Sequence, residues 1–510
     1  MNPDQKDNLY VPEGNRDHDG SRRQVLGIDV GTSGTKVLLI DASGKIAGQG
    51  YQGYRIYSEG NRIEQNPEDW WDACITAVNQ AVSGKKNTEI RAISLSTQGA
   101  TMAALDAGGK PVGRAITWMD TRAKEEADKI ESLLGKGEVY RICGWRSGPS
   151  FDASKILWMK NQGYKEAKLF VSTIEYINLK LTGRAVIDPT NAAIRQLYNV
   201  NTGNWDERIL NAVGVSAKEL PTIQRTGEPV GNLTGEAAAA LGLEKTVQVY
   251  NGAHDQYCAS LGCGAVNTGD MLVSTGTAWV LMGITDKPIF SDTYIAACTH
   301  PVKGLYGNIA SLTGTGASYQ WVKDTYLPNE SFLSIDEKAA QKIQKCKNLY
   351  FLPWLSGAGY PVWNMNARGG FIGIDYSFDA YCMALAVMES AAFSLKNAVK
   401  DFENHGSKPK AITIMGGAAN SKVWLDILTA VLDLPLYKME ITDSCALGAA
   451  FIAARAEGWY GDYASAAQAV VKQEKVPKAE ANRDFYLKKC QRYNNVLAAM
   501  KEMYSSGGTA

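Results

Sequence analysis

Two segments of the chain repeat one pattern, in which an apolar run leads through a Gly/Thr turn into a second apolar run. The first runs from Gln24 to Asp41 and the second from Gly269 to Met282. Apolar runs that flank glycine and hydroxyl residues predict a pair of strands. The turn can present backbone N–H groups to a phosphate, although an ordinary hairpin turn uses the same residues. The repetition predicts two related domains that face a shared phosphate site.

Strand and helix patterns alternate through the rest of the chain. A capping residue, Asn66, and a proline at the next position predict a helix start at Pro67. Further strands are predicted at 90–96, 247–250 and 411–415, and further helices at 380–402 and 422–432. This alternation predicts an α/β protein.

The chain has 510 residues, which is too long for one hydrophobic core and favours two or more domains. The second hairpin pattern begins after Gly262-Cys263-Gly264, so the boundary is expected near residue 264. We therefore predict a loose N-terminal tail over 1–23, an N-terminal domain over 24–264 and a C-terminal domain over 265–510.

Charge and cysteine content narrow the function. The formal net charge is zero, so neither nucleic acid nor an anionic membrane surface is an expected partner. Nine cysteines occur without a CxxC pair, which is typical of reduced thiols in a cytoplasmic protein. We found no run of about eighteen apolar residues that would span a membrane. A small-molecule ligand is therefore expected.

The candidate catalytic residue is Asp255, in the stretch Gly252-Ala253-His254-Asp255-Gln256. A strand leads into this stretch and a helix pattern follows it. A carboxylate fixed at such a junction can accept the proton of a substrate hydroxyl while the oxygen attacks phosphorus. The alternative is that Asp255 only caps the helix. His254 is expected to be structural.

Other polar residues follow predicted strands. Asp29 ends the first strand and could hold a metal ion that accompanies a phosphate. Gln98 follows the strand at 90–96, where ligands gather in α/β sheets, although a surface turn explains it as well. Trp118 could stack on a sugar ring, with Asp120 and Arg122 ordering the loop or reaching hydroxyls, although most of the tryptophans are expected in the core.

Taken together, these pieces resemble the FGGY carbohydrate kinase family, in order from about residue 24 to about residue 463. The matching motifs are Gly27-Ile28-Asp29-Val30-Gly31-Thr32, Glu64-Gln65-Asn66-Pro67 with Trp70-Trp71, Gly252 to Gln256, Gly276-Thr277, Leu352-Pro353 to Gly357, Ala367-Arg368-Gly369, Gly416-Gly417-Ala418 and Ala446-Leu447-Gly448-Ala449-Ala450. The resemblance implies an α/β fold of two actin/Hsp70-like (ribonuclease H-like) ATPase domains around a central cleft. It also implies that ATP and Mg²⁺ take part.

The resemblance implies a role for each matching residue. Asp255 would be the general base, and Asp29 would hold Mg²⁺. The substrate-binding residues would be Gln98, Gly99, Trp118, Asp255 and Gln256. The ATP-binding residues would be Thr32, Ser33, Lys36, Gly276, Thr277, Gly316, Gln320, Gly416, Gly417, Ala418 and Asn420.

Details of the motifs favour the xylulokinase-like branch. Residues 31–36 and Trp118-Met119-Asp120-Thr121-Arg122 are more similar to xylulokinases than to glycerol kinases, which carry an Arg-Glu pair near Gly99-Ala100. Xylulokinases typically have a histidine where this chain has Gln98, which leaves the sugar open. Asp152 and Cys382 also depart from the family's two signatures, and we expect both to lie away from the chemistry.

We therefore predict a kinase that uses Mg-ATP to phosphorylate a hydroxyl of a small sugar, such as a pentulose, a polyol or a sugar acid. The expected partners are the sugar and ATP, and a homodimer is allowed for. One rival is an actin- or Hsp70-like switch ATPase, which would need no base aimed at a sugar. A second rival is a degenerate kinase that acts as a sugar sensor.

Overall fold

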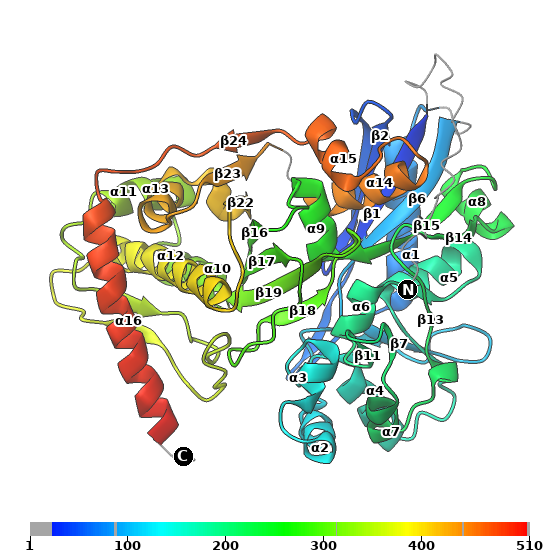
Figure 1. Ribbon diagram of the computed structural model, residues 1–510, viewed down its shortest axis with the longest axis horizontal. Coiled ribbons are helices and arrows are strands. Elements are labelled where there is room, and N and C mark those ends of the chain that lie inside the picture. The colour runs from blue at the N-terminus through cyan, green and yellow to red at the C-terminus, as the bar shows by residue number, and fades with distance from the viewer. Residues whose placement is uncertain (1–22, 86–88, 313, 441–442, 507–510) are drawn as a thin grey trace, which may run out of the picture.

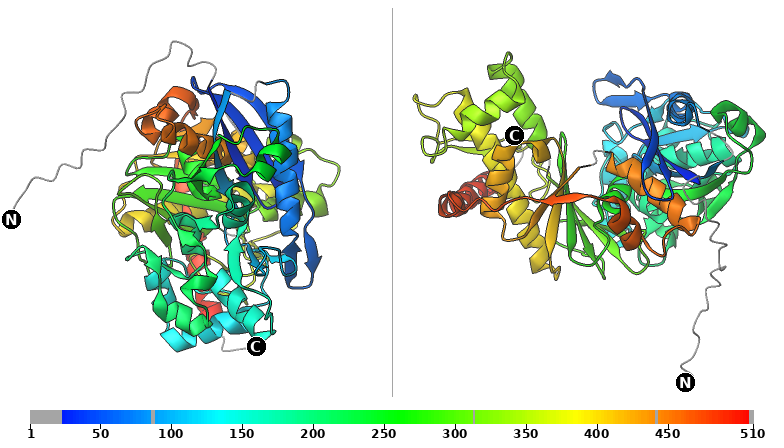
Figure 2. Two further views of the ribbon diagram at one scale, coloured as in Figure 1. Left: turned by 90° about the vertical axis from the view of Figure 1, so that its right-hand side faces the viewer. Right: turned by 90° about the horizontal axis from the view of Figure 1, so that it is seen from above.

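The computed structural model describes residues 23–85, 89–312, 314–440 and 443–506 (Figure 1). The tail predicted over 1–23 lies outside these residues except for Arg23. The described chain forms two bodies of helix and sheet, with the first half of the chain in one body and most of the second half in the other (Figures 1 and 2). The architecture is α/β, as predicted.

The first body is built on a six-stranded sheet. Its strands, in spatial order, are β14 (Pro229–Asn232), β15 (Gln248–His254), β6 (Ile90–Thr97), β1 (Gln24–Val30), β2 (Gly34–Asp41) and β3 (Ile46–Gly53). The predicted hairpin is present as the antiparallel pair β1–β2, and β1 also pairs in parallel with β6. β15 pairs in parallel with β6, so the carboxyl ends of β1, β6 and β15 meet at one edge.

The second body contains a seven-stranded sheet with a similar centre. Its strands, in spatial order, are β18 (Ala296–Thr299), β19 (Tyr306–Leu312), β17 (Trp279–Thr285), β16 (Asp270–Thr275), β22 (Ala411–Gly416), β23 (Leu436–Met439) and β24 (Gln473–Lys475). β16 pairs antiparallel with β17 and in parallel with β22. This repeats the arrangement of β1 with β2 and β6, so the predicted internal repeat is present in the two sheets.

Helices from distant parts of the sequence cover the first sheet. α1 (Pro67–Val82) packs on β2 and β3, whereas α14 (Ser444–Ala456) packs on β1, on β6 and on α9 (Asp255–Cys263). α14 therefore returns to the first body from late in the chain, and α15 (Tyr463–Val470) packs beside it (Figure 1). The predicted boundary at residue 264 falls between β15 and β16, yet the first hydrophobic core extends to Ala467.

Close backbone contacts explain how α14 fits. A Cβ on Gly448 would lie 1.9 Å from the carbonyl oxygen of Cys258 in α9, and one on Gly262 would lie 2.0 Å from that of Ser444. On the sheet side, a Cβ on Gly27 would lie 2.0 Å from the carbonyl oxygen of Ala446. Only glycine leaves room for these approaches.

Helices of the second body are α10 (Thr315–Tyr326), α11 (Phe332–Ala340), α12 (Ala380–Asn404), α13 (Lys422–Val431) and α16 (Arg483–Ser506). Among the described helices, α12 alone is long and apolar enough to cross a membrane by length and composition. However, 78% of that apolar window is buried inside the protein, and α12 packs against α10, α11 and α13. Packing in the core therefore accounts for its apolar character.

The remaining elements form smaller units around the first sheet and beside the second. A five-stranded sheet contains β4 (Tyr57–Glu59), β5 (Arg62–Gln65), β8 (Ala115–Ile116), β7 (Met102–Leu105) and β9 (Leu169–Ser172). The other helices of the first body are α2 (Lys124–Leu134), α3 (Glu138–Cys143), α4 (Asp152–Asn161), α5 (Thr173–Thr182), α6 (Pro189–Ile194), α7 (Glu207–Val213) and α8 (Gly235–Leu241). Two-stranded pairs are formed by β10 (Val186–Ile187) with β13 (Thr222–Ile223), β11 (Tyr198–Asn199) with β12 (Asn204–Trp205), and β20 (Tyr350–Leu352) with β21 (Gly370–Ile372).

The contact between α9 and α14 gives a testable prediction. Gly448→Ala should lower the free energy of unfolding by about 3 kcal/mol, because the new methyl group meets backbone that cannot move aside cheaply. Gly461→Ala is the matched control, since a Cβ there meets nothing within 4 Å. Chemical denaturation of both variants measures the effect. Equal stability of Gly448→Ala and the parent would contradict the packing.

Candidate active site

Asp255 lies at the junction of β15 and α9. The strand continues to His254, four residues beyond its predicted end, and Asp255 is the first residue of the helix. His254 occupies the N-cap position, and the cap has no side-chain hydrogen bond, so the alternative of Asp255 as a helix cap has no support. The Oδ1 atom of Asp255 is buried, lies 3.2 Å from Nε2 of His254, and has no hydrogen-bond partner among the described residues. The carboxylate is therefore held close to the backbone and retains capacity to accept a proton.

Asp29 lies near the end of β1, on the other side of β6 from β15. Its Oδ1 accepts a hydrogen bond of 2.8 Å from the Ser96 hydroxyl on β6. Burial raises the pKa of Asp29 to about 7, the charges of Asp255 and Asp443 add to the rise, and Ser96 and Lys36 oppose it. The rise shows that the negative charge of Asp29 lacks sufficient local compensation. A cation beside this carboxylate would supply that compensation.

The start of α14 contacts two predicted site residues of the first body and one strand of the second body. The Asp443 carboxylate accepts a hydrogen bond of 2.6 Å from the Lys36 ammonium group on β2. The next two residues contact the other neighbours, because the Ser444 hydroxyl lies 3.5 Å from the sulfur of Met415 on β22 and the Cys445 thiol lies 3.5 Å from the Asp255 carbonyl oxygen. Lys36 is thus held beside Asp29 by a residue late in the chain.

The predicted substrate residues lie close to one another. A Cβ on Gly99 would lie 2.5 Å from the His254 ring, so the segment after β6 contacts the segment that ends β15. Trp118 is 44% exposed, and its indole nitrogen donates a hydrogen bond to the Thr32 hydroxyl over 3.1 Å. The Oε1 atoms of Gln98 and Gln256 are buried and have no hydrogen-bond partner among the described residues. Trp118 therefore lies by the Gly/Thr turn, on the surface and outside the core.

The predicted ATP residues of the second body converge on the carboxyl ends of β16 and β22. A Cβ on Gly316 would lie 1.9 Å from the Gly276 carbonyl oxygen, and Ala317 donates a backbone hydrogen bond to the Thr277 carbonyl oxygen. Gly416 has a φ of 89°, and a Cβ there would lie 2.4 Å from the Thr275 carbonyl oxygen. The backbone of Ala418 donates to the Thr275 hydroxyl over 3.1 Å.

The remaining ATP candidates are distributed around these loops. Gly417, Ala418 and Asn420 form a short 3₁₀ helix after β22, where the sequence predicted only a glycine loop. Gln320 is on the exposed side of α10, and its amide nitrogen donates to Asp324. Ser33 is exposed in the turn between β1 and β2. No described contact ties Gln320 or Ser33 to the other candidates.

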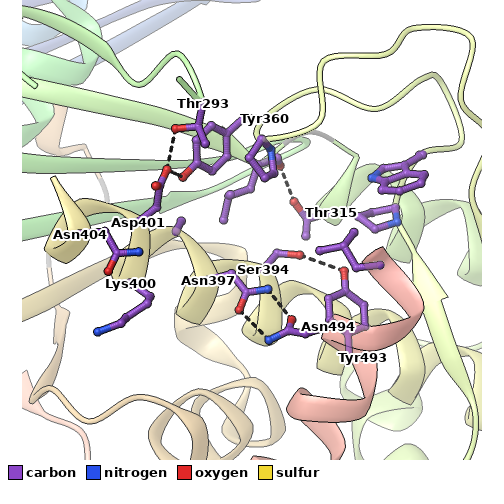
Figure 3. A pocket seen from close by; sticks show the side chains of 16 residues that line it. Thr293, Thr315, Tyr360, Ser394, Asn397, Lys400, Asp401, Asn404, Tyr493 and Asn494 are labelled. Atoms are coloured by element: carbon purple, nitrogen blue, oxygen red, sulfur yellow. Dashed lines mark hydrogen bonds between the residues drawn. The ribbon is translucent and has the colours of Figure 1, made fainter. Parts of the chain in front are cut away.

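A cavity of about 330 Å³ in the second body contains none of the predicted site residues (Figure 3). It lies between α12 and α16 and is also lined by Trp354, Tyr360 and Thr315. Its Asp401 carboxylate accepts hydrogen bonds from the Tyr360 and Thr293 hydroxyls. Thr315 lines this cavity while the next residue, Gly316, contacts the Gly276 loop, so the cavity lies behind the predicted phosphate loop.

Several polar residues that the sequence raised prove to be structural. Asp120 is buried, accepts hydrogen bonds from Arg122 and from the backbone of Ile63, and so orders the loop. Asp152 lies 2.7 Å from Arg195, and both side chains are fully buried. Cys382 is buried in α12. Asp152 and Cys382 are therefore both buried within the packing of their bodies.

Four residues at the site went unnoticed as individual candidates in the sequence. Ser96 contacts Asp29, Asp443 contacts Lys36, the Thr190 hydroxyl accepts from the backbone of His254, and Gln65 contacts Gln98. The contacting residues are 33 to 407 positions apart in the chain. The Asp443-Ser444 pair just before the motif at 446–450 was the one local signal, and it resembles an ordinary helix start.

Comparison with known proteins assigns the family. Residues 24–262 match the N-terminal domain of the FGGY family of carbohydrate kinases, and residues 271–457 match its C-terminal domain. The chain belongs to the FGGY family of carbohydrate kinases. It is therefore a two-domain kinase of the actin/Hsp70-like ATPase class that phosphorylates sugars with ATP, as the sequence predicted.

Xylulose and gluconate kinases are among the relatives of this FGGY kinase. A xylulose kinase of Staphylococcus epidermidis is 27% identical over 488 residues, which cover 94% of this chain and 97% of the relative. The structure of a ligand-bound xylulose kinase from Lactobacillus acidophilus has a TM-score of 0.88 at 26% identity and covers 94% of this chain and 98% of the other. A gluconate kinase from the same organism has a TM-score of 0.89 at 26% identity, with coverages of 95% and 99%.

The buried charge of Asp29 predicts a trade between stability and function. Above pH 7 the folded FGGY kinase must ionise this carboxyl, whereas the unfolded chain ionises it near pH 3.8. The protonated Asp29 carboxyl thus contributes to the stability of the folded state at low pH, and this contribution is lost as the pH rises toward 7. Asp29→Asn should stabilise the ligand-free protein by about 2–3 kcal/mol more at pH 8 than at pH 5.

Denaturant titration of the parent and of Asp29→Asn at both pH values tests this prediction. The comparison at pH 5 is the control, because the parent carboxyl is mostly protonated there in the folded state. The same variant should lose sugar phosphorylation. An equal change in stability at the two pH values would show that the carboxyl is not strained by its burial.

Proposed function

We propose that this kinase transfers the γ-phosphoryl group of ATP to a hydroxyl of a small ketose, polyol or sugar acid, with Asp255 as the general base. The observation that carries the proposal is the position of the Asp255 carboxylate. It lies at the junction of β15 and α9, beside the buried charge of Asp29, with a carboxylate oxygen that has no hydrogen-bond partner among the described residues. Sugars of pentulose size are the first candidates, because xylulose kinases are among the relatives.

The reaction needs a proton acceptor at the attacking hydroxyl. In the proposed step, an oxygen of Asp255 accepts the hydroxyl proton as the sugar oxygen forms its bond to the γ-phosphorus, and the bond from that phosphorus to the ADP oxygen breaks. The contact of His254 with Asp255 and the hydrogen bond of Thr190 to the His254 backbone support the orientation of the carboxylate.

Charge neutralisation is assigned to two residues, Asp29 and Lys36. The residues present fit Mg²⁺, because the pKa of Asp29 is raised by burial and by the nearby charges of Asp255 and Asp443, and hard carboxylate oxygens suit this ion. Asp29 would hold Mg²⁺, which would offset the negative charge of the phosphates. Lys36, held by Asp443, would do the same from the protein side. No group of three or more metal-ligating side chains occurs among the described residues, so nucleotide oxygens and water would complete the coordination.

The two glycine-rich loops are assigned to ATP. Thr32, Ser33 and Lys36 would approach the transferring phosphate, and Gly276 and Thr277 the β- and γ-phosphates. The nucleotide pocket would be formed by Gly316, Gln320, Gly416, Gly417, Ala418 and Asn420. The free state of all nine cysteines supports a reducing, cytoplasmic setting.

A substitution of Asp255 distinguishes the proposed kinase from the two alternatives, a switch ATPase and a degenerate sugar sensor. A switch ATPase would need no proton acceptor for a sugar, and a degenerate sensor would not turn over. Asp255→Asn keeps the shape of the side chain while it removes the base. It should reduce kcat for sugar phosphorylation by about 100- to 10,000-fold, with a much smaller change in sugar binding.

An ADP-release assay with Mg-ATP against ketoses, polyols and sugar acids measures this effect. Calorimetric titration of the variant with the best sugar supplies the binding control. If the sugar-stimulated turnover of Asp255→Asn equals that of the parent, Asp255 is not the base. If no sugar raises ADP release by the parent, the assignment to these substrates is wrong.

A further inference from the structure

A chain of hydrogen bonds fixes which atom of the Gln98 amide is free. The chain starts at Trp70, which is fully buried in α1 and whose indole nitrogen can only donate. This nitrogen lies 3.1 Å from a side-chain atom of Gln65, which must therefore be the oxygen, Oε1. The other side-chain atom of Gln65 lies 2.6 Å from the carbonyl oxygen of Thr32 and must be the nitrogen. Two independent neighbours thus assign the same orientation to the Gln65 amide.

The orientation passes from Gln65 to Gln98. The Gln98 side chain lies 2.8 Å from the same Oε1 atom of Gln65, and only its Nε2 can donate there. The remaining atom of the Gln98 amide is therefore the carbonyl oxygen. This oxygen is buried and has no hydrogen-bond partner among the described residues. A buried acceptor without a donor destabilises the ligand-free protein, so a ligand that supplies a donor gains affinity there.

Two other buried atoms near the Gln98 oxygen can also accept hydrogen bonds. The Oδ1 atom of the Asp255 carboxylate is an acceptor, and Nδ1 of His254 is an acceptor when the ring proton is on Nε2. Both His254 Nδ1 and Asp255 Oδ1 are buried and lack hydrogen-bond partners among the described residues. Gly99 contacts the His254 ring, so these acceptors and Gln98 belong to one neighbourhood. Gln256 differs, because no described donor fixes which way its amide turns.

We propose that Gln98 selects the substrate by polarity, accepting a hydrogen bond from a sugar hydroxyl and rejecting a carboxylate at that position. The inference rests on the proposed function and narrows it to neutral polyhydroxy substrates, ketoses or polyols, in preference to sugar acids. A hydroxyl can donate to the Gln98 oxygen, whereas a carboxylate would place negative charge against an acceptor. Gln65 acts as a positioning residue, because it prevents the amide of Gln98 from turning its nitrogen toward the substrate.

The test compares kcat/KM for matched substrates of the full-length protein. The panel contains the best neutral sugar, its monodeoxy analogues and the aldonate with the same number of carbons. The parent should prefer the neutral sugar over the aldonate by at least about 100-fold, and one monodeoxy analogue should lose about 100-fold or more. In Gln98→Met, kcat/KM for that same deoxy analogue should be lower than kcat/KM for the full sugar by less than about tenfold.

A second variant tests the positioning role. Gln65→Met removes the acceptor that holds Nε2 of Gln98, so the amide is free to turn. The ratio of aldonate to neutral kcat/KM should then rise by about tenfold or more, which a purely structural role for Gln65 would not produce. Gln49→Met, at an exposed position of β3, is the matched control and should leave this ratio unchanged.

Each outcome supports or overturns the inference. If the parent phosphorylates the aldonate as well as the neutral sugar, the inference is wrong while the kinase assignment stands. The inference would also be wrong if the ratio of kcat/KM for the full sugar to that for the deoxy analogue were the same in Gln98→Met as in the parent. If no sugar is phosphorylated, the proposed function fails and this inference fails with it. The comparison of aldonate with neutral sugar needs only the parent, so a variant that does not fold leaves the test intact.

Discussion

The return of α14 to the first body is the constraint on which the active site depends. Three glycines, Gly27, Gly262 and Gly448, let its backbone lie directly against β1 and α9. At that distance, the cap residue Asp443 reaches Lys36, and Cys445 in the first turn of α14 reaches the backbone of Asp255. A helix displaced by one methyl group would move Asp443 away from Lys36. The position of Lys36 therefore depends on how closely the backbone of α14 packs against β1 and α9, although these contacts do not involve Lys36 itself.

The site concentrates negative charge that the folded protein alone does not neutralise. Asp29 and Asp255 lie at the ends of β1 and β15, the two strands that flank β6, and Lys36 serves the cluster while it is also paired with Asp443. Burial makes this arrangement costly for the free protein, and a bound cation would relieve the cost. Such a site should bind Mg-ATP with a more favourable free energy than a neutral pocket would, because binding also removes an electrostatic penalty that the free protein carries.

The sequence predicted the features that depend on local pattern. Both hairpins, the junction at Asp255 and the glycine loops at 276 and 416 follow from strand periodicity and turn residues. The role of Gln98 as an acceptor could not be predicted, because it depends on Gln65, which is 33 residues away in the chain, and on an indole in a helix. The same limit applies to Asp443, whose partner is 407 residues away. Local patterns encode elements, whereas side-chain partners between elements are set by the tertiary fold.

The path of the chain also constrains the order in which the protein can be built. The first hydrophobic core includes residues from 446 to 467, so the N-terminal body cannot complete its core until most of the chain has left the ribosome. Until then, the apolar faces of β1 and α9 that receive α14 stay uncovered. Synthesis of this protein therefore passes through a long interval in which the apolar surface that α14 will cover is accessible to chaperones or to another copy of the nascent chain.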